Sequence, residues 1–376
     1  MKYPASRFFP AAWYCGLAIV GFSLSAFGSE SKSSPDLKNP PGQFIPAGDP
    51  RFNYEGRFDF SEPSSPVVIW QGSRISLDFE GAQLALKFTE AKDQNFFNVQ
   101  VDDGPVEIIA VRNAGPQRIE LRALKTAGRH RLVLFKRTEA ATGQARFTGV
   151  EIAPGAQAWA PAKPAYKLRM EFFGDSIMVG ACNEDGATDQ WEDRSTHNNA
   201  LSYTTLTAGS FTADYRCIAM SGMGIATGYV EVKAGEVWNR VYPLADSLLA
   251  DLKSWQPDVA FVNFGENDDS FSRAQQQPFP AGYTPGYIAL MKAMRAAYPK
   301  THFVLLRGGM YGGSQSTSLR EAWEKVVKEV EATDPEISHY VFTHWSSTHP
   351  RVSDDRALAD ELITWLKRQP FMKRFL

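Results

Sequence analysis

The hydrophobic pattern of the chain changes once, near its middle. Between about residues 54 and 154, short runs alternate apolar and polar residues with a period of two, and turn signals such as Asp103-Gly104-Pro105 separate them. Alternation of this kind predicts strands with one buried face. The runs are residues 74–79, 83–88, 97–101, 131–136 and 147–152. Since no helical periodicity interrupts them, they favour an antiparallel β-sandwich, a fold of about 100 residues.

Beyond residue 154, apolar strands alternate with helical patterns. Continuous apolar runs of strand length, typical of parallel strands that are buried on both faces, cover residues 167–173, 259–264 and 303–307. Helical patterns cover residues 245–252, 286–295, 318–332 and 353–368. This order predicts an α/β domain with a parallel sheet. The chain therefore divides into a β-sandwich domain, 51–160, and an α/β domain, 165–376.

The first 50 residues belong to neither domain. Two basic residues, an apolar run over 11–22 and small residues ahead of Ser29 predict a signal peptide over 1–28. A membrane anchor is the alternative, but the run is shorter than the roughly 20 residues that span a bilayer. The polar, proline-rich stretch 29–50 predicts a linker. We expect a secreted or periplasmic protein.

Composition narrows the possible partners. The 376 residues include 40 basic and 42 acidic side chains, which leaves a formal charge of −2. Because nucleic-acid binding needs a basic surface, we expect no nucleic acid as partner. No His, Cys or carboxylate cluster has metal-ligand spacing, so we predict no metal and no cofactor.

Two cysteines remain after the predicted cleavage. Cys182 and Cys217 follow or end strands that should be neighbours, and exported proteins commonly oxidise such pairs. We predict a disulfide that braces the two loops; two separate buried thiols are the alternative.

Three strand ends of the α/β domain carry candidate chemistry, because ligands of open parallel sheets bind beyond these ends. Ser176, in Gly174-Asp175-Ser176, is presented like a nucleophile, although a serine there could also cap the next helix. Asn267 can donate its amide N–H to a developing oxyanion. The glycine-rich turn 221–224 can add a backbone N–H.

A serine nucleophile needs a base. The candidates are His130, His197, His302, His339, His344 and His349. His130 lies in the sandwich and His302 leads into a buried strand, whereas His349 lies on the loop before the last helix. His349 is the best-placed base.

In this order, the four motifs resemble the blocks of SGNH/GDSL hydrolases over residues 165–370. The resemblance implies that Ser176 is the nucleophile and His349 the base. It also implies an oxyanion hole formed by the backbone N–H groups of Ser176 and Gly222 and by the Asn267 amide.

The front half is similar to the sandwich domain of carbohydrate esterase family 2. The segments that carry this similarity are Tyr54-Glu55-Gly56-Arg57, Trp70-Gln71-Gly72-Ser73, Val101-Asp102-Asp103-Gly104 and Lys136-Arg137-Thr138-Glu139. The resemblance implies a jelly-roll-like sandwich followed by a three-layer α/β/α SGNH domain. It also implies removal of O-acetyl groups from plant polysaccharides such as xylan and glucomannan.

The chain departs from the SGNH pattern next to His349. Many SGNH enzymes carry Asp three residues before the histidine, where this chain has Ser346. Some family 2 members use a Ser-His dyad with a backbone carbonyl on the ring, so we expect a dyad here. Asp354 and Asp355 are expected in the first turn of the last helix, where acids suit the helix dipole. Trp345 is a candidate for stacking on a sugar, with core packing as the alternative.

Two other functions remain open. One is an SGNH esterase for other small acyl esters, and the other is a non-catalytic carbohydrate-binding protein that keeps only the fold. Because the four motif residues are intact, catalysis on an acetylated polysaccharide is the preferred hypothesis.

Overall fold

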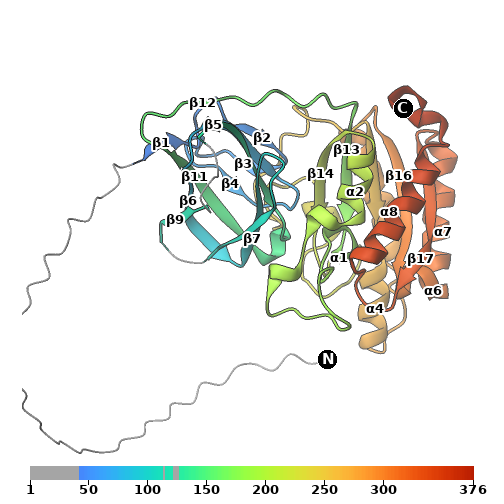
Figure 1. Ribbon diagram of the computed structural model, residues 1–376. Coiled ribbons are helices and arrows are strands. Elements are labelled where there is room, and N and C mark those ends of the chain that lie inside the picture. Colours follow the sequence, from blue (N-terminus) through green and yellow to red (C-terminus); the bar gives the residue numbers. More distant parts are fainter. Residues whose placement is uncertain (1–41, 113–114, 122–126) are drawn as a thin grey trace, which may run out of the picture. The chain divides into compact units, whose positions relative to one another are not determined.

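The alternating runs of the first half pair into two antiparallel sheets (Figure 1). The computed structural model describes residues 42–112, 115–121 and 127–376. The first sheet contains β1 (Gln43–Pro46), β3 (Phe58–Asp59), β4 (Val67–Val68), β6 (Leu84–Asp93), β9 (Gln117–Glu120) and β11 (Gly143–Ile152). The second contains β2 (Asn53–Glu55), β5 (Arg74–Glu80), β7 (Asn95–Val101), β8 (Glu107–Val111), β10 (Arg129–Lys136) and β12 (Ala158–Trp159). Side chains such as Phe79, Phe88 and Phe147 fill one core between them, so the expected β-sandwich is confirmed.

The linker prediction is wrong for its last part. Residues 43–46 form β1, which pairs with β11 from Gln43 opposite Ile152 to Pro46 opposite Gly149. Pro46 stands at the end of this strand, where its missing N–H is tolerated. The predicted signal peptide and the rest of the linker, up to residue 41, lie outside the described residues.

The second half forms a parallel sheet with helices on both faces. Its strands are β13 (Leu168–Gly174), β14 (Ala213–Ala219), β15 (Val259–Asn263), β16 (His302–Met310) and β17 (Ile337–Ser346), in the order β14-β13-β15-β16-β17. Phe172 and Val304 pack towards α2 (Tyr203–Ser210) and α8 (Val352–Leu366). Their neighbours Phe173 and Leu305 pack towards α5 (Tyr283–Ala297) and α7 (Thr317–Thr333). Successive residues of a strand therefore serve two cores, and the three-layer α/β/α arrangement is confirmed.

Three of the four expected helices are present, as α5, α7 and α8. The fourth, residues 245–252, is wrong: it is an irregular segment that pairs with the residues before it. Val241 N–H donates to Leu248 O, Ala250 N–H donates to Asn239 O, and the Arg240 guanidinium donates to Ser247 O at 2.7 Å. These bonds use the backbone groups that a helix would need.

The remaining helices are short and lie mostly in the connections. They are α1 (Ser176–Val179), α3 (Ala234–Val237), α4 (Glu266–Ala274) and α6 (Tyr311–Gln315), with 3-10 turns at Ala140–Thr142, Arg194–Thr196, Asn199–Leu201 and Pro370–Phe375. Within the described residues, no helix has the length and hydrophobicity to cross a membrane.

Buried polar contacts join the sandwich to the α/β domain, and residues 42–376 form one compact unit. Arg57 pairs with Glu171 of β13 at 3.0 Å and donates to Trp238 O at 2.7 Å. Trp70 donates its indole N–H to Val241 O at 2.7 Å. Because each donor is buried, separation of the two parts would expose charges and amides that are now satisfied.

Candidate active site

The turn at the end of β13 presents Ser176. Asp175 is the N-cap of α1, and its carboxylate accepts the Ile177 backbone N–H at 3.1 Å. Ser176 is the first residue of the helix, so the alternative of a capping serine is wrong. Gly174 is required here because a Cβ would lie 2.9 Å from Asn263 O and 2.6 Å from Met178 Sδ. Ser176 is only 3% exposed.

Asn267 lies against this turn. Its amide nitrogen donates to Asp175 Oδ2 at 3.2 Å and to Met223 O at 3.0 Å. Burial raises the pKa of Asp175 to about 8, and the negative charges of Glu266 and Asp268 add to the effect. The structure thus brings two of the predicted site residues, Ser176 and Asn267, to one place. Their roles in the oxyanion hole remain predictions.

The acids around Asn267 hold the neighbouring loops. Asp268 accepts the backbone N–H groups of Ile225, Ala226 and Thr227 at 2.7–3.0 Å. These residues follow Gly222, whose φ of +82° lies in the left-handed region that glycine adopts easily. The polar strand end after β15 therefore fixes the turn that carries the predicted backbone donor.

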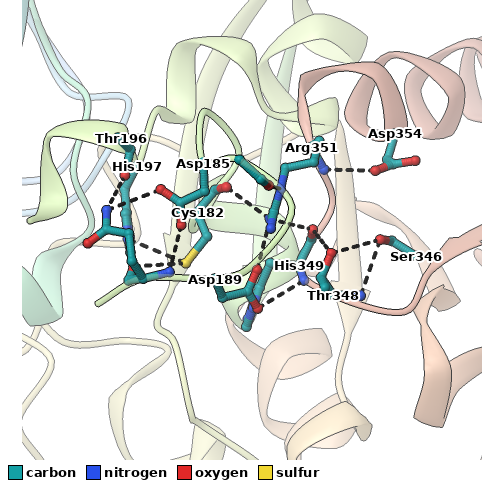
Figure 2. A network of polar contacts seen from close by, with 12 residues as sticks. Cys182, Asp185, Asp189, Thr196, His197, Ser346, Thr348, His349, Arg351 and Asp354 are labelled. Carbon is teal, nitrogen blue, oxygen red and sulfur yellow. Dashed lines mark hydrogen bonds and ion pairs between the residues drawn. The ribbon is translucent and has the colours of Figure 1, made fainter. Parts of the chain in front are cut away.

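His349 has a carboxylate partner that its local sequence did not indicate (Figure 2). Its ring Nδ1 lies 2.7 Å from Asp189 Oδ2, and its backbone N–H donates to the same oxygen at 3.2 Å. Since an ionised carboxylate only accepts, Nδ1 is the donor and Nε2 carries the lone pair. The expectation of a dyad held by a backbone carbonyl is therefore wrong for this structure.

Asp189 is itself held in place. Arg351 Nη1 lies 2.8 Å from its other oxygen, Oδ1. Burial alone would raise the pKa of Asp189, but the hydrogen bond and charge of His349, together with Arg351, lower it to about 2. The carboxylate is therefore ionised beside the ring at neutral pH, as a partner of an imidazolium must be.

Spacing could not reveal Asp189, because it lies 160 residues before His349. It belongs to the loop after α1, where Glu184, Asp185, Glu192 and Asp193 make an acidic stretch. That stretch is the only hint in the sequence. Ser346, at the position where many SGNH enzymes carry Asp, contacts Thr348 instead.

The other acids near His349 have structural roles. Asp354 and Asp355 lie in the first turn of α8, as expected. Asp354 accepts the Arg351 backbone N–H at 2.9 Å, and Asp355 accepts the Tyr203 backbone N–H at 2.9 Å.

Aromatic side chains surround the site. The Trp191 ring meets the His349 ring edge to face, with 5.0 Å between centroids, and meets His197 in the same way at 5.2 Å. Trp345, the predicted sugar-stacking residue, is 37% exposed and contacts Tyr311 with 6.2 Å between centroids. Because Trp345 is exposed, the core-packing alternative does not hold, and stacking on a sugar stays a prediction.

The predicted disulfide is wrong. Cys182 and Cys217 are both buried free thiols with different surroundings. Cys182 Sγ lies 3.5 Å from His197 Nε2, whereas Cys217 Sγ accepts from Gln71 Nε2 at 3.3 Å. Burial raises the pKa of both thiols.

Two residues of the sandwich, Arg137 and Glu139, contact the two loops that flank the site. Arg137 donates to Ser195 O at 2.7 Å and to His197 O at 3.3 Å, and pairs with Glu184 of the loop that carries Asp189. Glu139 accepts the backbone N–H of Ser221, next to Gly222, at 2.6 Å.

Comparison with known proteins agrees with this geometry. Residues 172–362 match the model of the GDSL-like lipase/acylhydrolase family, and residues 54–162 match that of the carbohydrate esterase 2 N-terminal domain. The chain belongs to carbohydrate esterase family 2. As a family member it is a carbohydrate esterase of the SGNH/GDSL hydrolase type.

Individual relatives cover most of this carbohydrate esterase. It is 29% identical over 329 residues to an acetylxylan esterase / glucomannan deacetylase of Cellvibrio japonicus, covering 82% of this chain and 87% of the relative. It is also 29% identical over 352 residues to the cellulase/esterase CelE of Acetivibrio thermocellus, covering 91% of this chain but only 41% of the relative. The chain therefore spans about two-fifths of that longer protein.

A solved structure shows the same arrangement. A family two carbohydrate esterase from Clostridium thermocellum in complex with cellohexaose superposes with a TM-score of 0.76 at 27% identity, covering 84% of this chain and 98% of the other.

Proposed function

We propose that this esterase is exported and removes O-acetyl groups from plant polysaccharides such as xylan and glucomannan, through an acetyl-enzyme on Ser176. The observation that carries the proposal is the pair His349–Asp189 on the same edge of the parallel sheet as the Ser176 turn. The activity named for the Cellvibrio japonicus relative, an acetylxylan esterase / glucomannan deacetylase, supports the choice of substrate.

The first half of the proposed reaction forms the acetyl-enzyme. His349 Nε2 takes the proton of Ser176 Oγ, and Oγ attacks the acetyl carbonyl carbon. The backbone N–H groups of Ser176 and Gly222 donate to the oxyanion, and the Asn267 amide joins them by exchanging its 3.2 Å hydrogen bond to Asp175 for one to the oxyanion. The C–O bond to the sugar then breaks, and the sugar oxygen takes the proton from His349.

The second half releases acetate. Water gives a proton to His349 Nε2 and attacks the acetyl carbon, and the bond to Ser176 Oγ breaks as Oγ takes that proton back. In both halves the imidazolium is stabilised by the Asp189 carboxylate at 2.7 Å.

Exposed aromatic rings support a polysaccharide substrate. Trp345 and Tyr311 are 37% and 45% exposed and lie beside each other at the end of β16 and β17. Sugar rings stack on exposed aromatic side chains, so Trp345 would be a contact for the polysaccharide chain. An esterase that acts on small acyl esters would not need the exposed Trp345 and Tyr311 side chains to bind its substrate.

Binding without catalysis is a second candidate. The Clostridium thermocellum structure is a complex with cellohexaose, which favours an unsubstituted β-glucan as a ligand of the same site here. If cellohexaose inhibits hydrolysis of an acetyl ester competitively, the glucan and the acetyl ester bind to one site.

The test is acetate release from acetylated xylan and glucomannan, compared with propionyl and butyryl esters of 4-nitrophenol. Ser176→Ala should lose several orders of magnitude in turnover. Ser346→Ala is the matched control and should keep nearly full activity, because its hydroxyl contacts only Thr348. A folded Ser176→Ala protein with more than a few per cent of the activity would exclude Ser176 as the nucleophile.

Export has its own test. Expression of the full chain followed by fractionation and N-terminal sequencing should yield mature protein that begins at Ser29 outside the cytoplasm. Protein that keeps Met1 and stays with the membrane would instead favour the anchor.

A further inference from the structure

Potential metal ligands from distant parts of the chain meet beside the catalytic histidine (Figure 2). Cys182 Sγ, a carboxylate oxygen of Asp189 and a ring nitrogen of His349 all lie within 4.8 Å of one another. A second imidazole adjoins them, because His197 Nε2 lies 3.5 Å from Cys182 Sγ. Thiolate, imidazole and carboxylate are the three ligand types that Zn²⁺ takes in proteins.

We propose that this cluster is an inhibitory site for a thiophilic divalent cation such as Zn²⁺, bound by Cys182, Asp189 and His349 Nδ1. The proposal rests on the role of His349 as the base. Ligands of one zinc ion stand about 3–4 Å apart, given bond lengths of about 2.0–2.3 Å. The longest separation in the cluster, up to 4.8 Å, would therefore have to shorten by about 1–2 Å. His197 is near enough to Cys182 to supply the fourth ligand.

Such an ion would compete with the Nδ1 proton of His349, which fixes the tautomer that the proposed reaction needs. The working base has its proton on Nδ1, shared with Asp189, and its lone pair on Nε2. A metal on Nδ1 needs the lone pair there, so the ring proton moves to Nε2. In that tautomer Nε2 donates and cannot accept the Ser176 proton. The Cys182 thiol gives its own proton to solvent as the thiolate forms.

The charges around the cluster allow binding. Arg351 holds Asp189 Oδ1 at 2.8 Å, while His349 holds Oδ2. The carboxylate can therefore keep Arg351 on one oxygen and offer the other to the ion. The thiolate together with Asp185 and Asp189 supplies negative charge against the guanidinium groups of Arg351 and Arg194. Solvent reaches the cluster on the side of Asp189 and His349, whose side chains are 21% and 14% exposed, whereas Cys182 is buried.

Inhibition kinetics test the proposal. Hydrolysis of 4-nitrophenyl acetate by the full chain is measured against increasing ZnCl₂ in a non-chelating buffer, then after EDTA, with MgCl₂ as the hard-ion control. Wild type should be inhibited by Zn²⁺, restored by EDTA and unaffected by Mg²⁺. Cys182→Ala should keep its basal activity and need at least about tenfold more Zn²⁺ for the same inhibition. Cys217→Ala, which removes the other buried thiol, should respond like wild type.

Two results would overturn the proposal: a wild-type enzyme indifferent to Zn²⁺, or a Cys182→Ala protein as sensitive as Cys217→Ala. If Cys182→Ala does not fold, Cys182→Ser replaces it, since the side chain keeps its size but loses the thiolate.

Binding of Co²⁺ gives a readout that does not depend on catalysis. Wild type and Cys217→Ala should show thiolate-to-cobalt charge-transfer absorption that the Cys182 variant lacks. A protein without any esterase activity would refute the proposed function, while its cobalt spectrum would still decide the metal site. Identical spectra for the three proteins would refute the site.

Discussion

Asp189→Asn tests whether the third member of the site comes from the loop after α1. The variant keeps the size of the side chain and can still accept a hydrogen bond, but it removes the charge that faces the His349 ring at 2.7 Å. It also leaves Arg351 without its ionic partner, because Arg351 Nη1 lies 2.8 Å from Asp189 Oδ1 in the wild-type protein. The imidazolium formed during each half-reaction then loses its stabilising charge.

The size of the effect follows from how the carboxylate is shared. In serine proteases, loss of a buried triad Asp costs about 10⁴ in turnover. Here Arg351 neutralises part of the charge, and the Asp189 side chain is 21% exposed. We therefore expect a fall in kcat of about 10²–10³, which corresponds to about 3–4 kcal/mol. KM should change little, since in the proposed reaction Asp189 does not touch the substrate.

The assay is kcat and KM on 4-nitrophenyl acetate and acetylated xylan, with thermal melts to check the fold. Asp193→Asn is the matched control: it lies on the same loop, and its carboxylate caps the 3-10 turn at Ser195 instead of reaching His349. A folded Asp189→Asn enzyme with more than about half of the wild-type kcat would refute the triad and restore the dyad.

Three further predictions follow from buried groups. Thiol titration of the denatured, unreduced chain lacking residues 1–28 should find two free thiols, Cys182 and Cys217. Finding no free thiol would support the disulfide instead. Arg137→Met should lower both the melting temperature and kcat but leave KM, because it frees the loop of Asp189. Burial raises the pKa of Asp355 to about 8, so the folded state binds a proton that the unfolded state has lost above about pH 4. Stability should therefore fall as pH rises from about 4 to 8, and Asp355→Asn should reduce that fall in urea melts at pH 5 and 8.

Local patterns revealed much of the fold. Strand alternation is set by neighbours in sequence, so runs such as 74–79 and 131–136 predicted β5 and β10 closely. The turn at Ser176 and the strand end at Asn267 were also predicted from local motifs. Their proximity followed because parallel strands bring the loops at their carboxyl ends to one edge of the sheet. The segment 245–252 shows the limit: its apolar spacing suits a helix, but its backbone groups bond to residues 239–241 instead.

Contacts between distant segments could not be predicted in this way. Asp189 reaches His349 only because its loop folds back across the edge of the sheet, and no spacing rule links the two. The disulfide prediction failed similarly: Cys182 lies beyond α1 and Cys217 lies within β14, and position along the chain does not fix the direction of either side chain. Cys182 faces His197, whereas Cys217 faces Gln71.

The sandwich supports the loops of the proposed site through two residues of one segment. Arg137 holds the loop that brings Asp189 to His349, and Glu139 holds Ser221 beside Gly222. One segment of the first domain thus contacts both the side that carries the proposed base, His349, and the side that carries the proposed oxyanion donor, Gly222. Placement within about half an ångström is what such a site needs from its surroundings. An α/β domain alone would lose both supports together with the buried Arg57–Glu171 and Trp70–Val241 contacts, so it should lose stability and kcat together.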